Sequence, residues 1–195
     1  MRCLAIFDFD GTLTFKDSLS DFIAYTVGKS RMMFGACRLS PYIAAYSLKL
    51  MDNGRAKQKV LGHFFAGWQD ETLRAAGTAY ALERLPKILR PQGLECLHWH
   101  LDQGHKVLVA SASPEVWLRS WTENMQIGLI GTVLEKKDGR ITGRYQGLNC
   151  HGQEKARRIQ QKYDLTGYDS IYAYGDTPGD KPMLALADQA FYKPF

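Results

Sequence analysis

Two aspartates lie close together at the end of the first apolar run of the chain. Residues 4–7 (LAIF) are followed directly by residues 8–12 (DFDGT). A short apolar run that is rich in Ile and Phe and stops at a glycine predicts a buried strand. Side chains two residues apart on a strand share a face, so Asp8 and Asp10 are expected to project the same way. Such a pair repels unless a cation lies beside it or one member acts as an acid.

Two later apolar runs also end in polar residues. Residues 106–110 (KVLVA) run into Ser111. Residues 171–174 (IYAY) run into the segment GDTPGD, which contributes Asp176 and Asp180. Strands that alternate with helices form a parallel sheet whose carboxyl ends share one edge, so we expect these side chains to meet the first aspartate pair in one crevice. Each segment alone is also compatible with an ordinary polar turn, so the prediction rests on their convergence.

The predicted group of aspartates requires positive charge. Carboxylate oxygens crowded around an anionic substrate are typical of a Mg²⁺ site beside a phosphate. Lys155 is the candidate cation for the phosphoryl oxygens, because it lies in the first turn of a helix predicted over residues 153–163, where the macrodipole disfavours a cation. Lys106 lies at the wrong end of its strand. Lys181 lies near the correct edge and stays an alternative.

The pattern of strands and helices divides the chain. Residues 15–88 lack the alternation of a parallel sheet and show the apolar spacing of helices. From Pro91 onward helices and strands alternate, and Asp138-Gly139 marks a hairpin turn. We therefore predict an α/β fold, a Rossmann-like parallel sheet flanked by helices, with an inserted all-helical domain. The sheet domain would comprise residues 1–14 and 89–195, and the helical domain residues 15–88.

The composition fits a single folded core that acts on an anionic substrate. The chain has 195 residues, 45% apolar residues and a formal charge of +5, which suits one well-packed core. Scattered basic residues favour attraction of an anion, and without a dense basic run no nucleic-acid partner is predicted. Four cysteines without CxxC spacing are predicted to be buried free thiols. Because the N-terminus runs directly into the first strand, we expect no signal peptide and a cytoplasmic location.

The motifs resemble those of the haloacid dehalogenase superfamily. Residues 8–14 (DFDGTLT) resemble its first motif, Asp-any-Asp-any-Thr. Ser111 resembles the second motif, Lys155 the third and the segment GDTPGD the fourth, in the expected order. The members most similar to this chain are magnesium-dependent phosphatases, and the helical insert is similar to the cap domain of the phosphoserine-phosphatase-like subfamily. The resemblance therefore implies a phosphatase.

The resemblance also implies a role for each motif residue. Asp8 would attack phosphorus and form an aspartyl phosphate. Asp10, supported by Thr12, would protonate the leaving alkoxide and later accept a proton from water. The Mg²⁺ ligands would be Asp8, Asp176 and the main-chain carbonyl of Asp10, with Asp180 orienting the ligands of the metal. The residues that bind the phosphoryl group would be Ser111, Lys155, Thr12, Gly11 and Ala112.

Several substrate classes fit this sequence. Phosphoserine phosphatases usually carry a glutamate shortly after the first motif and Ser-Gly-Gly at the second, whereas this chain has Asp17 and Ser111-Ala112-Ser113. The insert looks like that of phosphatidylglycerophosphatase C-type enzymes. The predicted substrate is therefore a phosphorylated small metabolite or a lipid head group, with phosphoserine as the alternative. The non-enzymatic alternative is a phosphate-binding module with a vestigial site.

Two features of the insert are compatible with peripheral membrane contact. Residues 39–48 (LSPYIAAYSL) form an uncharged run well short of the roughly 20 residues that span a bilayer. The run is predicted to be a core helix of the insert or, alternatively, an apolar surface that touches lipid. The basic residues that would meet lipid head groups are Arg38, Lys49, Arg55, Lys57 and Lys59. A solvated helix face explains the same residues.

Overall fold

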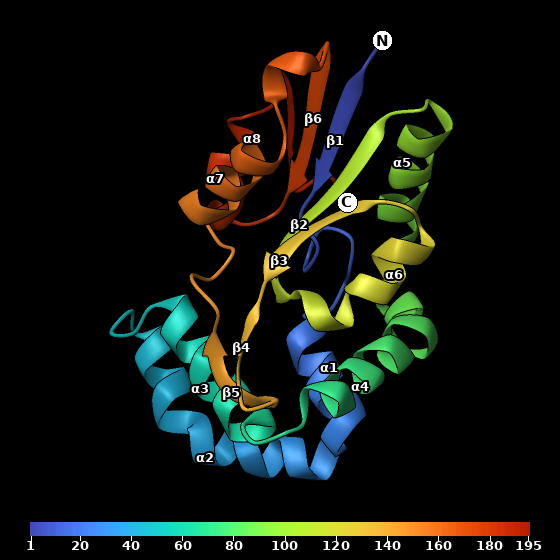
Figure 1. Ribbon diagram of the computed structural model, residues 1–195. Coiled ribbons are helices and arrows are strands. Elements are labelled where there is room, and N and C mark those ends of the chain that lie inside the picture. Colours follow the sequence, from blue (N-terminus) through green and yellow to red (C-terminus); the bar gives the residue numbers. More distant parts are fainter.

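A five-stranded parallel sheet forms the centre of the molecule (Figure 1). The computed structural model describes residues 1–195. The strands in chain order are β1 (Cys3–Phe7), β2 (Lys106–Pro114), β3 (Gly128–Thr132), β6 (Ser170–Gly175) and β7 (Gln189–Tyr192). Their spatial order is β3-β2-β1-β6-β7, and each neighbouring pair is parallel. The strand that carries the first motif is therefore central, and the predicted α/β class is confirmed.

Every residue of β1 is buried, because helices cover both faces of the sheet. Alternate residues of β1 enter two different cores, with Leu4 and Ile6 in one and Ala5 and Phe7 in the other. The first core includes residues of α7 (Gln153–Lys162) and α8 (Lys181–Leu184). The second includes residues of α5 (Pro91–Asp102) and α6 (Arg119–Asn124). Such two-sided burial is typical of parallel sheets.

Four helices lie beyond the carboxyl ends of the strands (Figure 1). They are α1 (Ser18–Val27), α2 (Lys29–Ser47), α3 (Asn53–Phe65) and α4 (Asp70–Glu83). Short 3-10 helices occur at Leu85–Ile88, Glu115–Trp117, Leu165–Gly167 and Pro178–Asp180. The ring of Phe22 stacks on Trp117 at 4.6 Å and contacts Phe65 and Tyr80, which joins α1, α3 and α4 to the segment after β2. An aromatic cluster therefore fixes these helices against the sheet domain.

The structure differs from three details of the sequence prediction. Strand β2 continues past residue 110 because Pro114 pairs with Thr132 of β3. The predicted hairpin forms as β4 (Leu134–Lys137) and β5 (Arg140–Tyr145), but it packs on α3 in a sheet of its own. All four cysteines are free thiols, as predicted, but only Cys3 and Cys150 are buried, whereas Cys37 is exposed on α2 and Cys96 is half-buried. None of the helices combines the length and apolar character needed to span a bilayer.

Gly77 of α4 lies against the backbone that follows β2. A Cβ at this position would collide with the carbonyl oxygen of Val116, a main-chain atom that cannot rotate away. We predict that Gly77→Ala lowers the free energy of unfolding by about 1–3 kcal/mol, because the added carbon overpacks the contact. Nothing lies within 4 Å of a Cβ built on Gly62 of α3. Gly62→Ala should therefore raise the free energy of unfolding by up to about 1 kcal/mol. Urea denaturation of both variants checks this; equal stabilities would contradict it.

His100 joins α5 to the sheet from a fully buried position. Its Nε2 lies 2.9 Å from the Tyr174 hydroxyl, and its Nδ1 lies 2.8 Å from Nδ1 of His105. Burial, with a smaller contribution from His105, lowers the pKa of His100 to about 4. The folded protein therefore holds this imidazole neutral, whereas the unfolded chain takes up a proton below its ordinary pKa of about 6.5. The stability that neutral His100 contributes is fully present above the unfolded-state pKa of about 6.5 and is lost as the pH falls toward the folded-state pKa of about 4.

We predict that the free energy of unfolding falls by about 2 kcal/mol between pH 7 and pH 5 through His100 alone. His100→Gln should remove that part of the pH dependence, since glutamine does not titrate. His98→Gln is the matched control because His98 is exposed on the same helix. Denaturation curves at both pH values measure the difference. An unchanged slope in His100→Gln would refute the assignment.

Candidate functional site

The predicted residues from distant parts of the chain meet at the carboxyl edge of the sheet. Asp8 follows β1, Asp180 follows β6, and Lys155 comes from the first turn of α7. The Lys155 ammonium donates to Oδ1 of Asp8 and to Oδ1 of Asp180, each at 2.6 Å. The lysine is 1% exposed. Lys181, the alternative, is exposed and forms no ion pair.

Burial and pairing oppose each other in this ion-pair triad. Burial raises the pKa of Asp8 to about 7, although Lys155 opposes the shift, and Asp180 adds to it by like charge. For Asp180 burial acts the same way, but Lys155 and Thr177 outweigh it and lower the pKa. Burial would lower the pKa of Lys155, and the two carboxylates raise it instead. One ammonium therefore does not fully offset the cost of burying two carboxylate charges. Asp8 is the less stabilised of the two, because its pKa is raised and that of Asp180 is lowered.

A third carboxylate completes an oxygen cluster. Carboxylate oxygens of Asp8, Asp176 and Asp180 lie within 4.8 Å of one another. The Thr12 hydroxyl donates to Asp176 at 3.1 Å, with a longer contact of 3.4 Å to Asp8. The prediction that Thr12 supports Asp10 is therefore wrong, because Thr12 binds the cluster instead. Gly11 has a φ of +90°, and a Cβ there would collide with the Asp176 carboxylate, so the close approach requires glycine.

The turn that follows β6 orients Asp180. Both the backbone N–H and the hydroxyl of Thr177 donate to Oδ2 of Asp180, at 3.0 and 2.7 Å. This leaves Oδ1 for Lys155. The TPGD segment is a turn, as its composition indicates, but its internal hydrogen bonds fix a buried carboxylate beside the cluster.

Asp10 is held apart from the cluster by serines of two elements. Its Oδ1 accepts the backbone N–H of Ser18 at 2.7 Å, and its Oδ2 accepts the Ser113 hydroxyl at 2.5 Å. The hydroxyl oxygens of Ser18 and Ser113 lie 3.0 Å apart. Burial raises the pKa of Asp10, the negative charge of Asp17 adds to the shift, and Lys57 and these hydrogen bonds oppose it. Asp10 is therefore a carboxyl whose environment favours carrying a proton.

Sequence reasoning missed two residues near Asp10. Ser113 lies two residues after Ser111 on the same strand, and that spacing could have indicated a shared face. Lys57 was grouped with surface cations, yet its charge acts on both Asp10 and His151. No local signal in α3 distinguishes it from its neighbours, because only the packing of that helix brings it to the strand ends.

The two predicted phosphate-binding positions on β2 directly precede Ser113, the hydrogen-bond partner of Asp10. Ser111 is buried, and its hydroxyl oxygen accepts the backbone N–H of Ser113 at 3.0 Å. The carbonyl of Ala112 accepts the Thr132 hydroxyl at 2.9 Å. The acceptor role of the Ser111 oxygen leaves its own O–H proton available as a donor.

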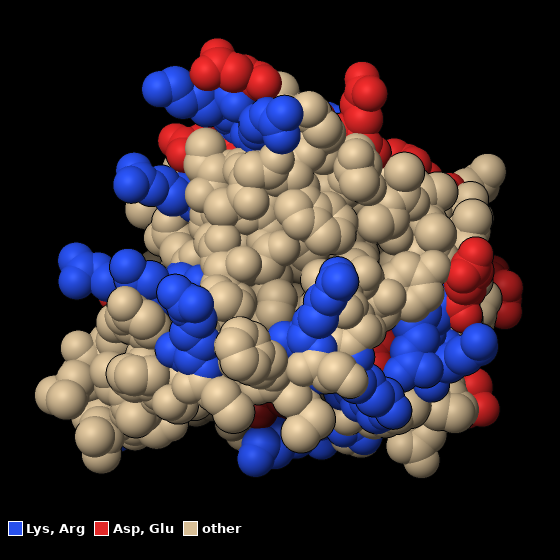
Figure 2. Space-filling model, turned by 90° about the horizontal axis from the view of Figure 1, so that it is seen from below, with Lys and Arg blue, Asp and Glu red and all other residues tan.

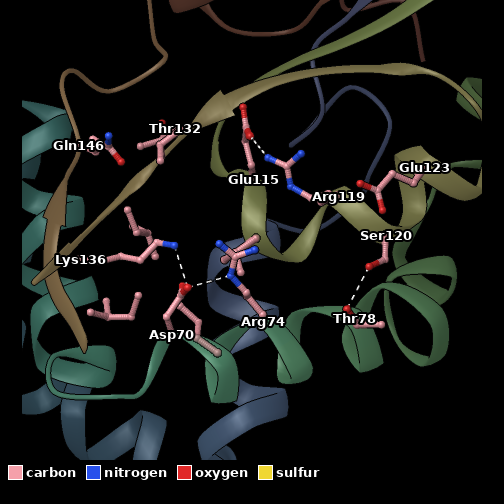
Figure 3. A pocket seen from close by; sticks show the side chains of 15 residues that line it. Asp70, Arg74, Thr78, Glu115, Arg119, Ser120, Glu123, Thr132, Lys136 and Gln146 are labelled. Carbon is pink, nitrogen blue, oxygen red and sulfur yellow. Dashed lines mark hydrogen bonds and ion pairs between the residues drawn. The ribbon is translucent and has the colours of Figure 1, made fainter. Parts of the chain in front are cut away.

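A separate cavity of about 550 Å³ opens between α4, α6 and the start of β4 (Figure 3). Asp70 points between Arg74 and Lys136, at 2.9 and 2.7 Å, and Glu115 pairs with Arg119. None of the predicted site residues lines this cavity. Most of its charged side chains pair with one another, and the carboxylate cluster does not line it.

Comparisons with known proteins agree with this geometry. The sequence profile of the haloacid dehalogenase-like hydrolases matches residues 5–185. Protein CicA of Caulobacter vibrioides is 35% identical across 98% of this chain and 86% of its own length. A solved Bordetella pertussis protein of unknown function is 25% identical, with a TM-score of 0.83 over 96% of this chain and 87% of that one.

A solved phospho-aspartyl intermediate analogue of phosphoserine phosphatase shares the fold, with a TM-score of 0.66 and 17% identity over 95% of this chain and 83% of its own. The family profile alone covers most of the chain, from β1 to the end of α8. Sequence match, fold and the meeting of Asp8, Lys155 and Asp180 thus point the same way. The chain belongs to the haloacid dehalogenase-like hydrolase family.

Proposed function

We propose that this hydrolase is a phosphatase that cleaves phosphomonoesters through a phosphorylated Asp8. The observation that carries the proposal is the buried ammonium of Lys155, shared between Asp8 and Asp180 at 2.6 Å each. A carboxylate with a cation on one oxygen keeps its other oxygen for attack on phosphorus. The same cation neutralises charge on the phosphoryl oxygens as the transition state forms. The likeness to phosphoserine phosphatase supports the proposal.

The reaction would proceed in two displacements. Asp8 attacks phosphorus, the bond between phosphorus and the ester oxygen breaks, and Asp10 gives its proton to the leaving alkoxide. Water then attacks the aspartyl phosphate, Asp10 takes up its proton, and inorganic phosphate leaves with Asp8 restored. Ser111 donates its hydroxyl proton to a phosphoryl oxygen. The separate hydrogen bonds of Asp10 support its distinct role.

The cluster of carboxylates fits a divalent cation. Three carboxylates within 4.8 Å of one another provide the hard oxygen donors that Mg²⁺ prefers, and the raised pKa of Asp8 indicates that Lys155 leaves their charge undercompensated. We propose that Asp8, Asp176 and the main-chain carbonyl of Asp10 hold the ion, with Asp180 orienting the ligands of the metal. When bound, Mg²⁺ supplies charge neutralisation for the phosphoryl group.

The helical insert would act as a cap that selects the substrate. Ser18 at the start of α1 binds Asp10, and Lys57 of α3 acts electrostatically on it, so both helices border the reacting group. We propose a phosphorylated small metabolite or a lipid head group as substrate, with phosphoserine as the second candidate because phosphoserine phosphatases share the fold. Free cysteines throughout support a cytoplasmic location.

A substrate panel distinguishes these classes. It compares kcat/KM for phosphoserine, sugar phosphates, nucleotides and phosphatidylglycerophosphate with Mg²⁺ present. The class with the highest value identifies the leaving group that the cap accepts, because discrimination appears in kcat/KM.

Replacement of the nucleophile should abolish turnover. We predict that Asp8→Asn leaves no Mg²⁺-dependent hydrolysis of an aryl phosphate, because an amide cannot form the phosphoenzyme. Asp102→Asn is the control, since Asp102 is an exposed carboxylate at the far end of α5. Intact-mass spectrometry after acid quenching should show a phosphate adduct in the wild type only. Retained turnover in Asp8→Asn, or an inactive wild type, would reject the proposal, the latter in favour of a binding module.

Replacement of the proton donor should depend on the leaving group. We predict that Asp10→Asn lowers kcat for an alkyl phosphate by about 10²–10⁴, because an alkoxide needs protonation as it leaves. The loss for p-nitrophenyl phosphate should be at least tenfold smaller, because its leaving group is stable as an anion. A parallel loss for both esters would argue for a structural role of Asp10.

A further inference from the structure

Helix α2 is a surface helix with little contact to the rest of the protein. Only Gly35 and Leu39 of its 19 residues are buried. Met33 and Phe34 are 70% and 71% exposed, and Leu48, directly after the helix, is 70% exposed. Phe34 lines a groove with Phe64 and Trp68, but most of its surface, like that of Met33 and Leu48, stays accessible to solvent. The helix therefore presents an uncovered apolar surface.

Helical periodicity places these side chains on one face. At 100° per residue, the positions opposite Gly35 and Leu39 are occupied by uncharged residues only. These residues form the outer face of α2: Ser30, Met33, Phe34, Cys37, Ser40, Pro41, Ala44 and, beyond the helix, Leu48. The predicted core helix over residues 39–48 is thus wrong for most of that run, since it is exposed except at Leu39 and Ala45.

Positive charge flanks the outer face and negative charge is absent. The chain has no Asp or Glu between Asp21 and Asp52. Its cations in that interval are Lys29, Arg31, Arg38 and Lys49, and none of them forms an ion pair. Seen from below, Lys and Arg side chains cross the lower half of the molecule, while Asp and Glu gather mainly at its top and right edges (Figure 2).

A basic groove adjoins the C-terminal half of α2. It has a volume of about 790 Å³ between α2, α3 and β5, and no carboxylate lines it. Arg38, Lys59 and Arg144 line it without ion-pair partners, and the Lys59 ammonium lies 5.3 Å from the centre of the Tyr42 ring. This groove lies on the Leu39 side of α2, so the cations beside the outer face are Lys29, Arg31 and Arg38 of the helix itself. Such cations beside an apolar face match the chemistry of an anionic lipid surface.

We propose that α2 docks this protein on an anionic lipid bilayer. Met33, Phe34 and Leu48 enter the boundary between head groups and acyl chains, and Arg31 and Arg38, which flank the outer face, contact the anionic head groups. A second copy of the chain is the less favourable occupant, because symmetric pairing of this face brings the same unpaired cations together. The proposal is independent of the proposed function, since docking requires no turnover.

Vesicle co-sedimentation tests the docking. The wild type should partition into vesicles of phosphatidylcholine with phosphatidylglycerol, and much less into phosphatidylcholine alone. Met33→Ser/Phe34→Ser should weaken partitioning about tenfold or more, because both side chains lose apolar burial. Leu148→Ser is the matched control, since Leu148 is 64% exposed elsewhere. Equal partitioning of the two variants, or no partitioning of the wild type, would overturn the proposal.

Two double variants, each of which removes two positive charges, test the electrostatic part of the docking. Arg31→Gln/Arg38→Gln should weaken binding to the anionic vesicles more than Lys87→Gln/Lys137→Gln, which removes the same charge from exposed sites elsewhere. Higher salt should weaken wild-type binding as screening increases. Equal effects of both pairs would remove the assigned head-group contacts and overturn the docking geometry.

Cys37 provides a reporter at the centre of the outer face. An environment-sensitive fluorophore on Cys37, in a Cys96→Ser background, should shift to the blue with anionic vesicles, because Cys3 and Cys150 are buried and unreactive. Analytical ultracentrifugation without lipid supplies the competing outcome. A dimer that Met33→Ser/Phe34→Ser dissociates, with no fluorescence shift on vesicles, would assign the face to a second copy and overturn the lipid proposal.

Discussion

A buried ammonium that requires two carboxylates is the constraint on which the site depends. Lys155 is almost fully buried, and an unpaired charge there would cost several kcal/mol. Its partner Asp8 lies 147 residues away in sequence and Asp180 lies 25 residues away, and the parallel sheet with β1 in the middle brings all three together. The order of the strands therefore determines which charges meet. A different order would separate Asp8 from Lys155, the cation that compensates it.

The sequence was sufficient for those parts of the fold that follow from local patterns. Apolar runs ending in Asp8, Ser111 and Asp176 predicted the strands and the edge where they meet, because parallel strands share a direction. The spacing of GDTPGD predicted a turn, and its internal bonds to Asp180 are consistent with that. The family that these motifs indicated is confirmed by a sequence match over most of the chain.

Other features depended on packing that no local pattern encodes. The Asp10 contacts come from a backbone N–H of α1 and a hydroxyl of β2, and their meeting depends on how the insert docks. The contact of His100 with Tyr174 is of the same kind, since a histidine on a helix reads as an ordinary surface residue. The exposed face of α2 reads as a core helix by composition alone, because apolar content does not reveal whether another element covers it.

The hydrogen bond from the Ser18 backbone to Asp10 has a consequence for motion of the insert. It is the first N–H of α1, so the helix that begins the insert also solvates the carboxyl group. Rotation of the insert away from the sheet would remove this donor together with part of the burial that is the main cause of the raised pKa of Asp10. The position of the insert and the proton affinity of this carboxyl group are therefore linked, because the helix that begins the insert contacts Asp10 directly.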